Sequence, residues 1–269
     1  MHYVVGKALL ICALTAGLAS AGNIVLTGHD DDLHQTAQAT AQAKGMFAFA
    51  RNGSTLPVLT FDAGSQLTSL LASLSIPFTN INPNTASNVT DALFDPALYS
   101  AFAVASDTSC GGCDNSPAGE ANIAAHAAAI GAFLNAGRGI VGFAGASSAN
   151  YYAFVPQAAS SVGGAPTFGY SATAVGTTYG IPAVDGDATH NLFWNPGTHG
   201  ESAFYQIAET NSSGSASVPG PAAVTLICNA CTVSGGVIGG TAPEPATYLF
   251  MAGGLAGLAF LRKVRTSVR

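Results

Sequence analysis

Positive charge is scarce in this sequence. Only eight of its 269 residues are lysine or arginine, and five of these lie near the two ends of the chain. Between the ends remain Lys44, Arg51 and Arg138 against thirteen acidic residues, a formal charge of −10. Such a surface excludes binding of DNA or RNA through phosphates. It attracts cations, and it repels acidic polysaccharides unless a divalent metal ion bridges the two.

Charge of either sign is rare as well. Charged residues make up 8% of the chain and apolar residues 48%, which excludes an intrinsically disordered protein. The 32 glycines follow no collagen repeat. The length suits one globular domain with short additional segments at the ends.

The N-terminus has the three parts of a secretory signal. Lys7 precedes an apolar run from Ala8 to Leu18, and the small residues Ala19, Ser20 and Ala21 follow. This order predicts a signal peptide over residues 1–21 that is cleaved after Ala21. The alternative is a buried N-terminal helix.

The C-terminus combines an acidic tripeptide, an apolar run and a basic tail. Pro243, Glu244 and Pro245 come first, and the apolar residues 246–261 follow. As a helix these 16 residues span roughly 24 Å, short for a bilayer core of about 30 Å, but flanking arginine and lysine can snorkel. We expect one transmembrane helix, with residues 22–232 as an exported domain and 233–242 as a linker. The basic tail, which holds the end in the cytoplasm, consists of Arg262, Lys263, Arg265 and Arg269.

Residues 243–269 resemble the PEP-CTERM sorting signal of Gram-negative bacteria that produce exopolysaccharide. The tripeptide, the Gly-rich apolar stretch and the arginine-rich end, beginning at Arg262, match it in order. The resemblance implies export, an inner-membrane precursor that faces the periplasm, and recognition by an exosortase. It further implies cleavage near the tripeptide and delivery to the cell surface or extracellular matrix. The alternative is a plain C-terminal membrane anchor.

Four cysteines remain once Cys12 leaves with the signal peptide. They form two Cys-x-x-Cys pairs, Cys110 with Cys113 and Cys228 with Cys231. Outside the cytoplasm such cysteines form disulfides, and pairing within each motif is favoured. Pairing between the motifs and a tetrahedral zinc site of all four cysteines are the alternatives.

Strand and helix patterns alternate through the first half of the domain. Strands are expected at 24–27, 57–61, 78–82, 100–107 and 138–146, and helices from Asp30–Asp32 to Ala43, at 64–75 and at 118–136. A helix broken at Pro156 is expected over 150–164, and strands at 203–209 and 222–228. This order predicts an α/β fold, a doubly wound and mostly parallel sheet between two helix layers.

The segments "TGHDDDLH", "AGRGIVGFAGA" and "ATHNLFW" resemble the class I glutamine amidotransferase-like fold, in its ThuA-like branch. The resemblance implies a flavodoxin-like three-layer sandwich. The amidotransferases carry a nucleophilic cysteine after the strand that corresponds to 138–146, where this chain has Ala146 and Ser147. The sequence therefore does not predict glutaminase chemistry.

The carboxyl ends of parallel strands meet at one edge of a sheet, where ligands bind. We expect the candidate binding residues Asp30, Asp31, Asp32, Asp114 and Ser147 at this edge, with His29 and Asp107 as catalytic candidates. A divalent metal is the candidate cofactor, with His29, Asp30, Asp32 and His34 as candidate ligands, and His29 could instead be a general base. The alternatives are structural. The aspartates at 30–32 then cap a helix, and Asp107 and Asp114 flank a loop that a disulfide stabilises.

Together these features predict an exported surface or matrix protein. Its domain is expected to be non-catalytic, with a structural or binding role toward extracellular polysaccharide. The alternative is a metal-assisted hydrolase, or another carbohydrate-active enzyme, that uses His29, Asp30–Asp32 and Asp107.

Overall fold

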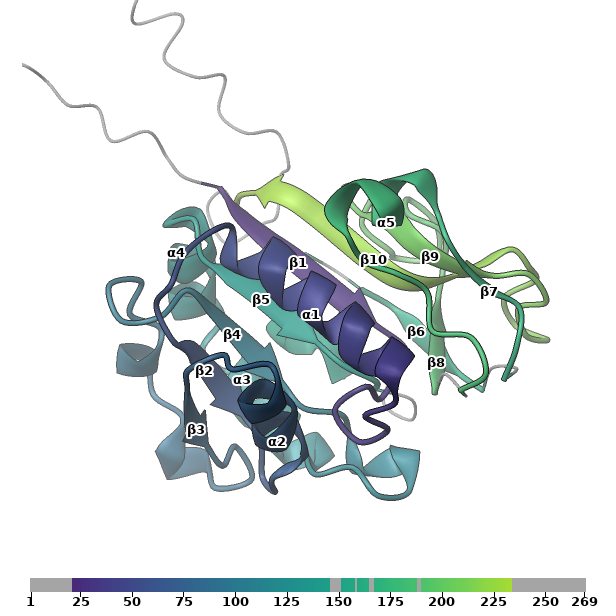
Figure 1. The fold of residues 1–269 in the computed structure, drawn as a ribbon. Helices are drawn as coiled ribbons and strands as arrows, with labels where there is room; N and C mark the ends of the chain where they lie inside the picture. The colour runs from purple at the N-terminus through teal and green to yellow at the C-terminus, as the bar shows by residue number, and fades with distance from the viewer. Residues whose placement is uncertain (1–20, 146–150, 158, 165–166, 188–189, 234–269) are drawn as a thin grey trace, which may run out of the picture. The chain divides into compact units, whose positions relative to one another are not determined.

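Ten strands of the computed structural model form one mixed sheet (Figure 1). The structure describes residues 21–145, 151–157, 159–164, 167–187 and 190–233. All of them belong to one compact unit, Ser20–Ala242. The strands are β1 (Gly22–Thr27), β2 (Val58–Phe61), β3 (Phe78–Ile81), β4 (Ala101–Val104), β5 (Gly139–Gly142), β6 (Ser161–Gly163), β7 (Tyr170–Ala172), β8 (Asn191–Phe193), β9 (Gln206–Asn211) and β10 (Ala222–Cys231). The helices are α1 (Ala37–Arg51), α2 (Gln66–Ser73), α3 (Pro117–Ala124), α4 (Ala127–Asn135) and α5 (Ala174–Tyr179), with four short 3-10 turns (Ala86–Asn88, Asp91–Leu93, Thr108–Cys110 and Tyr151–Phe154).

The five predicted strands of the first half are parallel, in the order β3-β2-β4-β5-β1. They are short runs of apolar and β-branched residues, and four of them are buried along their whole length. The exception is β3, an edge strand whose residues are largely exposed. Because their carboxyl ends point the same way, the loops that follow β1, β2, β4 and β5 gather at one edge of the sheet, as the sequence predicted.

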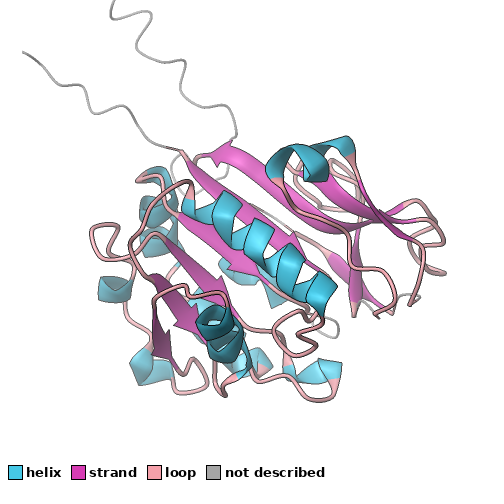
Figure 2. Ribbon diagram, in the orientation of Figure 1, coloured by secondary structure: helices cyan, strands magenta, loops and turns pink. Residues whose placement is uncertain are grey.

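Helices cover both faces of this parallel half (Figure 2). Apolar side chains of α1 and α2, such as Phe47 and Leu70, join one core cluster with Val25 of β1. On the opposite face Ile123 of α3 and Phe133 of α4 join a second cluster. The predicted α/β layering is confirmed for this part of the chain.

Two of the predicted helices differ from the prediction in their bounds. Helix α1 runs through Gly45 to Arg51, because apolar residues after Gly45, such as Met46 and Phe49, are buried in the core. Gly45 itself has no side chain to obstruct the backbone of Gly180. The expected helix 118–136 is divided at His126, whose backbone leaves helical geometry between α3 and α4. Its expected cap is confirmed, since the Ser116 hydroxyl accepts the Gly119 amide at 3.2 Å.

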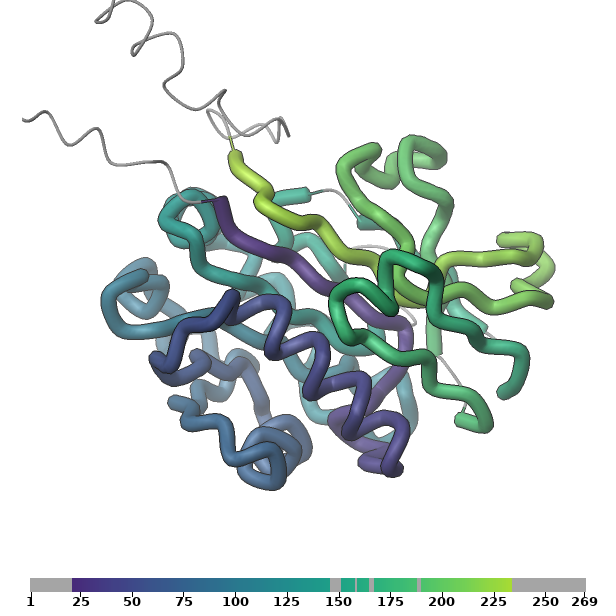
Figure 3. The backbone as a smooth tube through the Cα atoms, turned by 45° about the horizontal axis from the view of Figure 1, so that its top comes forward, coloured from purple at the N-terminus to yellow at the C-terminus, as the bar shows by residue number. Residues whose placement is uncertain are grey.

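The prediction of a mostly parallel sheet was wrong in extent. Strand β10 pairs antiparallel with β1, β8 and β9, and β6 and β7 add further antiparallel pairs. Figure 3 shows β1, in purple, running beside β10, in yellow-green. Strand β1 therefore lies at the border of the parallel block, unlike a flavodoxin-like order in which it is flanked by parallel strands. The segment expected as a broken helix over 150–164 holds a 3-10 turn and strand β6 instead.

Both cysteine pairs are bonded within their own motif. Cys110 pairs with Cys113, and Cys228 pairs with Cys231. The Cα atoms are 5.7 Å and 5.9 Å apart, inside the ordinary disulfide range. The local connectivity, which the sequence favoured, is the one present.

Several predicted features lie outside the residues that the structure describes. They are the signal peptide before Ala21, Ser147, most of the linker, and the tag with its expected helix over 246–261. Within the described ranges, we find no helix with the length and apolar character that crossing a bilayer requires.

Candidate functional site

The turn after β1 buries three consecutive aspartates at the carboxyl edge of the sheet. Asp30, Asp31 and Asp32 are each 1% exposed or less. The amides of Leu33 and His34 both donate to the Asp30 carbonyl, at 2.8 and 2.9 Å, which coils the turn. Helix α1 begins only afterwards.

The helix-capping explanation of the aspartates was wrong. Thr36 caps α1, and its hydroxyl accepts the Ala39 amide at 3.1 Å. The side chain of Asp30 is therefore available for other contacts.

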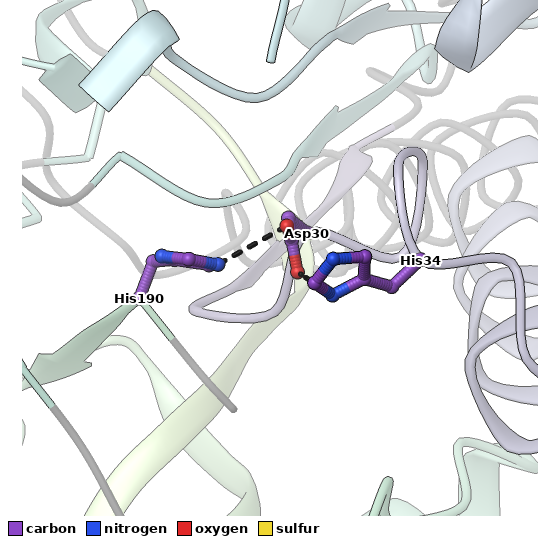
Figure 4. Close-up of side chains that lie close together, drawn as sticks. All are labelled: Asp30, His34 and His190. Atoms are coloured by element: carbon purple, nitrogen blue, oxygen red, sulfur yellow. Dashed lines mark ion pairs between the residues drawn. The ribbon is translucent and has the colours of Figure 1, made fainter. Parts of the chain in front are cut away.

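Asp30 lies between two histidines (Figure 4). Its Oδ1 atom is 3.3 Å from Nδ1 of His34, and its Oδ2 atom is 3.1 Å from Nε2 of His190. A second carboxylate, Asp187, lies 3.2 Å from the same Nδ1 atom of His34. One ring nitrogen of each histidine and one oxygen of Asp30 lie within 4.8 Å of one another. We call Asp30, His34 and His190 the Asp–His cluster.

Strand β8 brings His190 to this position. The His190 amide donates to the carbonyl of Gly28 at 2.8 Å, which ties the residue before β8 to the residue after β1. Strands β1 and β8 both pair with β10, one on each side of it. The residue before β8 therefore reaches the turn after β1 at the carboxyl edge of the sheet. His190 was visible in the sequence only as part of "ATHNLFW", and nothing local pointed to Asp30.

Acidic side chains dominate this edge. Burial, and then the charges of Glu209, Asp32 and Asp30, raise the pKa of Asp31 well above its usual range. Burial raises the pKa of Asp32 to about 7, although two hydrogen bonds from Ser106 oppose the shift. The close contact with the carboxylate of Asp30 raises the pKa of His190, although burial opposes the shift. Within the described ranges, every ion pair uses a histidine, and neither lysine nor arginine takes part in one.

The Cys110–Cys113 disulfide borders the cluster from the loop after β4. The Sγ atom of Cys113 is 3.9 Å from Oδ2 of Asp30. Because both sulfur atoms are bonded to each other, neither is a thiolate that could bind a metal ion.

His29 does not join the other metal candidates. Its Nε2 atom is 3.3 Å from Oε1 of Glu209, and its ring stacks edge-on against Tyr170. Glu209 also accepts hydrogen bonds from Gln42, Thr225 and the Val184 amide. His29 is 1% exposed, so this is a buried polar network away from solvent.

Of the remaining predicted residues that the structure describes, Asp32, Asp107 and Asp114 have structural partners, whereas Oδ2 of Asp31 is buried without a hydrogen-bond partner among the described residues. Asp32 accepts hydrogen bonds from the amide and hydroxyl of Ser106, and Asp107 accepts the Ser109 amide at 2.6 Å. Asp114 accepts the amides of Ser65 and Gln66 at the start of α2. The structure thus brings together Asp30 and His34, adds His190 and Asp187, and leaves His29, Asp32, Asp107 and Asp114 in other contacts.

Comparison with known proteins identifies one feature of the chain. Residues 241–263 match the PEP-CTERM protein-sorting motif. This match supports the resemblance of the tail and indicates an exosortase-sorted, exported protein with a membrane-anchored precursor in a Gram-negative bacterium. No curated protein matches the chain, and no solved structure matches it. The resemblance of the domain to amidotransferases therefore gains no support.

Proposed function

We propose that this chain is a non-catalytic surface or matrix protein that binds extracellular polysaccharide after exosortase processing. The sorting motif at residues 241–263 carries the proposal, because it directs the preceding domain out of the cell. The described elements fit cleavage at both ends. Strand β1 begins at Gly22, next to the predicted signal cleavage site, and β10 ends at Cys231, before the motif.

An aromatic pair supports a sugar ligand. Trp194 and His199 stack in the segment after β8, with ring centroids 3.8 Å apart and planes 17° apart. His199 is exposed, while Trp194 is half-buried against the core cluster around Leu192, so the His199 ring and part of the indole lie beside solvent. Aromatic rings of this kind present the apolar body and polar tip that suit a partly wet ligand.

A metal-assisted hydrolase is the second candidate. The Asp–His cluster favours it, since two imidazoles and a carboxylate are the ligands of many catalytic metal sites. A hydrolase would depolymerise the polysaccharide and would stop when the metal is chelated, whereas a binding protein would leave the polymer length unchanged. Size-exclusion chromatography of the polymer after incubation with the protein separates the two.

Sorting is tested in the producing bacterium. We expect wild-type protein in the surface or matrix fraction, shortened at its C-terminus, and full-length protein in the inner membrane of an exosortase deletion strain. Glu244→Ala should resemble the deletion, and Ser267→Ala, which lies beyond the matched motif, should resemble the wild type. Identical distribution of wild type and Glu244→Ala would contradict the proposal.

Ligand binding is tested by co-sedimentation with the matrix polysaccharide of the same strain. Trp194→Ala should reduce the bound fraction, and Phe168→Ala, at a residue that is 66% exposed, is the control for loss of an exposed aromatic ring. Equal binding by wild type and Trp194→Ala would contradict a role of the Trp194–His199 pair in sugar binding.

A further inference from the structure

We infer that the Asp–His cluster is a divalent transition-metal site, with Asp30, His34 and His190 as ligands and Asp187 as an adjacent second carboxylate. The site lies at the carboxyl edge of β1, where the turn after β1 meets the segment before β8. This inference goes beyond the proposed function and does not depend on how the chain is sorted.

The distances suit ligands of one ion. Two ligand atoms that each lie about 2.1 Å from a tetrahedral metal are about 3.4 Å apart. Oδ1 of Asp30 is 3.3 Å from His34 and Oδ2 of Asp30 is 3.1 Å from His190, while Asp187 is 3.2 Å from His34. One ligand atom from each residue of the Asp–His cluster lies within 4.8 Å of the others. A metal ion therefore requires only small movements of side chains that already converge.

The ligand types select the class of metal. Imidazole nitrogen with carboxylate oxygen suits zinc and other first-row divalent ions, whereas calcium and magnesium prefer sites made of oxygen alone. The adjacent sulfurs of Cys110 and Cys113 are held in a disulfide, so they do not turn the site into a thiolate site. We expect the Asp–His cluster to bind zinc much more tightly than calcium.

The surroundings leave the negative charge of the site without a permanent cation. Within the described part of the chain, Asp30 and Asp187 form ion pairs with histidines only, and Lys44, Arg51 and Arg138 form none. A buried carboxylate needs a charged or hydrogen-bonding partner, because burial without one is costly. A divalent cation supplies the compensation that lysine and arginine do not.

The site is also accessible. The side chain of Asp30 is 2% exposed, while those of His190, Asp187 and His34 are 22%, 21% and 45% exposed. The carboxylate of Asp30 forms the buried side of the site, and the histidines form its solvent side. A bound ion would therefore keep a coordination position that faces solvent, which a water molecule or an oxygen of a ligand could occupy.

The test measures metal binding directly. The full chain, purified in mild detergent and freed of metal with chelator, is titrated with zinc chloride and separately with calcium chloride by calorimetry. The double variant His34→Ala/His190→Ala removes both nitrogen ligands. His126→Ala is the matched control, since His126 also contacts an aspartate, Asp91 at 2.6 Å, but lies in the connection between α3 and α4 and is not part of the cluster.

We expect one zinc ion per chain, weak or no calcium binding, at least about tenfold weaker zinc binding in the double variant, and unchanged binding in His126→Ala. Zinc affinity that is equal in wild type and double variant would overturn the inference. So would a wild type that binds no zinc at concentrations up to about 1 mM.

A footprint on the wild-type protein makes the test independent of folding of the variants. Diethyl pyrocarbonate modifies accessible histidines, and peptide mass spectrometry locates the modification. Zinc should slow the modification of His34 and His190 and leave the exposed His199 unaffected. Protection of all three histidines, or of none, would contradict a site at the cluster.

Discussion

The Nε2 atom of His190 lies 3.1 Å from Oδ2 of Asp30, although the strands that these residues flank do not pair with each other. Strand β10 separates β1 from β8, and the contact spans it at the carboxyl edge. The carboxylate is almost fully buried, so the histidine is a major part of its environment.

Loss of this histidine should therefore destabilise the protein. We expect His190→Ala, measured in chelator by urea unfolding, to lower the free energy of unfolding by about 1–3 kcal/mol, because a buried carboxylate loses a partner. His126→Ala breaks a pair whose aspartate is 78% exposed, so its cost should stay below about 1 kcal/mol. Equal effects of the two substitutions would show that burial of Asp30 does not matter.

Glu201 should make stability depend on pH. Burial raises its pKa from 4.5 to about 8, while one hydrogen bond from the Ser160 amide opposes the shift. The unfolded chain releases this proton near pH 4.5, but the folded protein keeps it to about pH 8. The free energy of unfolding should therefore fall as pH rises through this window.

The variant Glu201→Gln has no carboxyl group to ionise, so its free energy of unfolding should not fall in this pH window. Relative to wild type, we expect the variant to gain roughly 2–4 kcal/mol between pH 5 and pH 8, as measured by urea unfolding at both values. The glutamine carbonyl can still accept the Ser160 amide. A difference between wild type and variant that does not change with pH would contradict the raised pKa.

Gly45 should resist substitution although it lies inside a helix. Alanine favours a helix over glycine by about 1 kcal/mol, but a Cβ atom at this position would collide with the Gly180 carbonyl. We expect Gly45→Ala to lower stability by about 1–3 kcal/mol in urea unfolding. Lys44→Ala, on the exposed neighbour, is the control and should change stability by less than about 0.5 kcal/mol. A stabilised Gly45→Ala variant would show that α1 and the end of α5 separate easily.

Asp114 should stabilise the start of α2 from a distant loop. Its Oδ2 atom accepts the amides of Ser65 and Gln66 at 3.0 and 3.2 Å, while Ser65 makes no side-chain cap. Asp114→Ala should cost about 0.5–2 kcal/mol, the usual cost of a lost cap. Asp114→Asn keeps an acceptor oxygen and should cost less. If both variants unfold at the same urea concentration as wild type, these hydrogen bonds contribute nothing.

In the exported protein, each disulfide should join the two cysteines of one Cys-x-x-Cys motif. The denatured intact mass should lie about 4 Da below the fully reduced value, since each disulfide removes two hydrogen atoms. A non-reducing protease digest should show no peptide that joins the Cys110–Cys113 segment to the Cys228–Cys231 segment. A cross-linked peptide of that kind would contradict the local pairing.

Short-range sequence patterns determined the parallel half of the fold and the sorting of the protein. Buried runs such as Ile24–Thr27 and the cap at Ser116 need no distant partner to be recognised, because strand patterns and helix caps are short-range signals. The same holds for the sorting motif, which is contiguous.

Only the tertiary structure decided which candidate residues meet. His29 and Asp30 are neighbours in sequence, yet one faces Glu209 in the interior and the other faces His34 and His190. The antiparallel strand β10 lies between β1 and β8 and pairs with both, which brings His190 to the end of β1, and no local pattern contains these pairings. Side-chain direction and strand order are long-range properties, so the Asp–His cluster had to come from the folded chain.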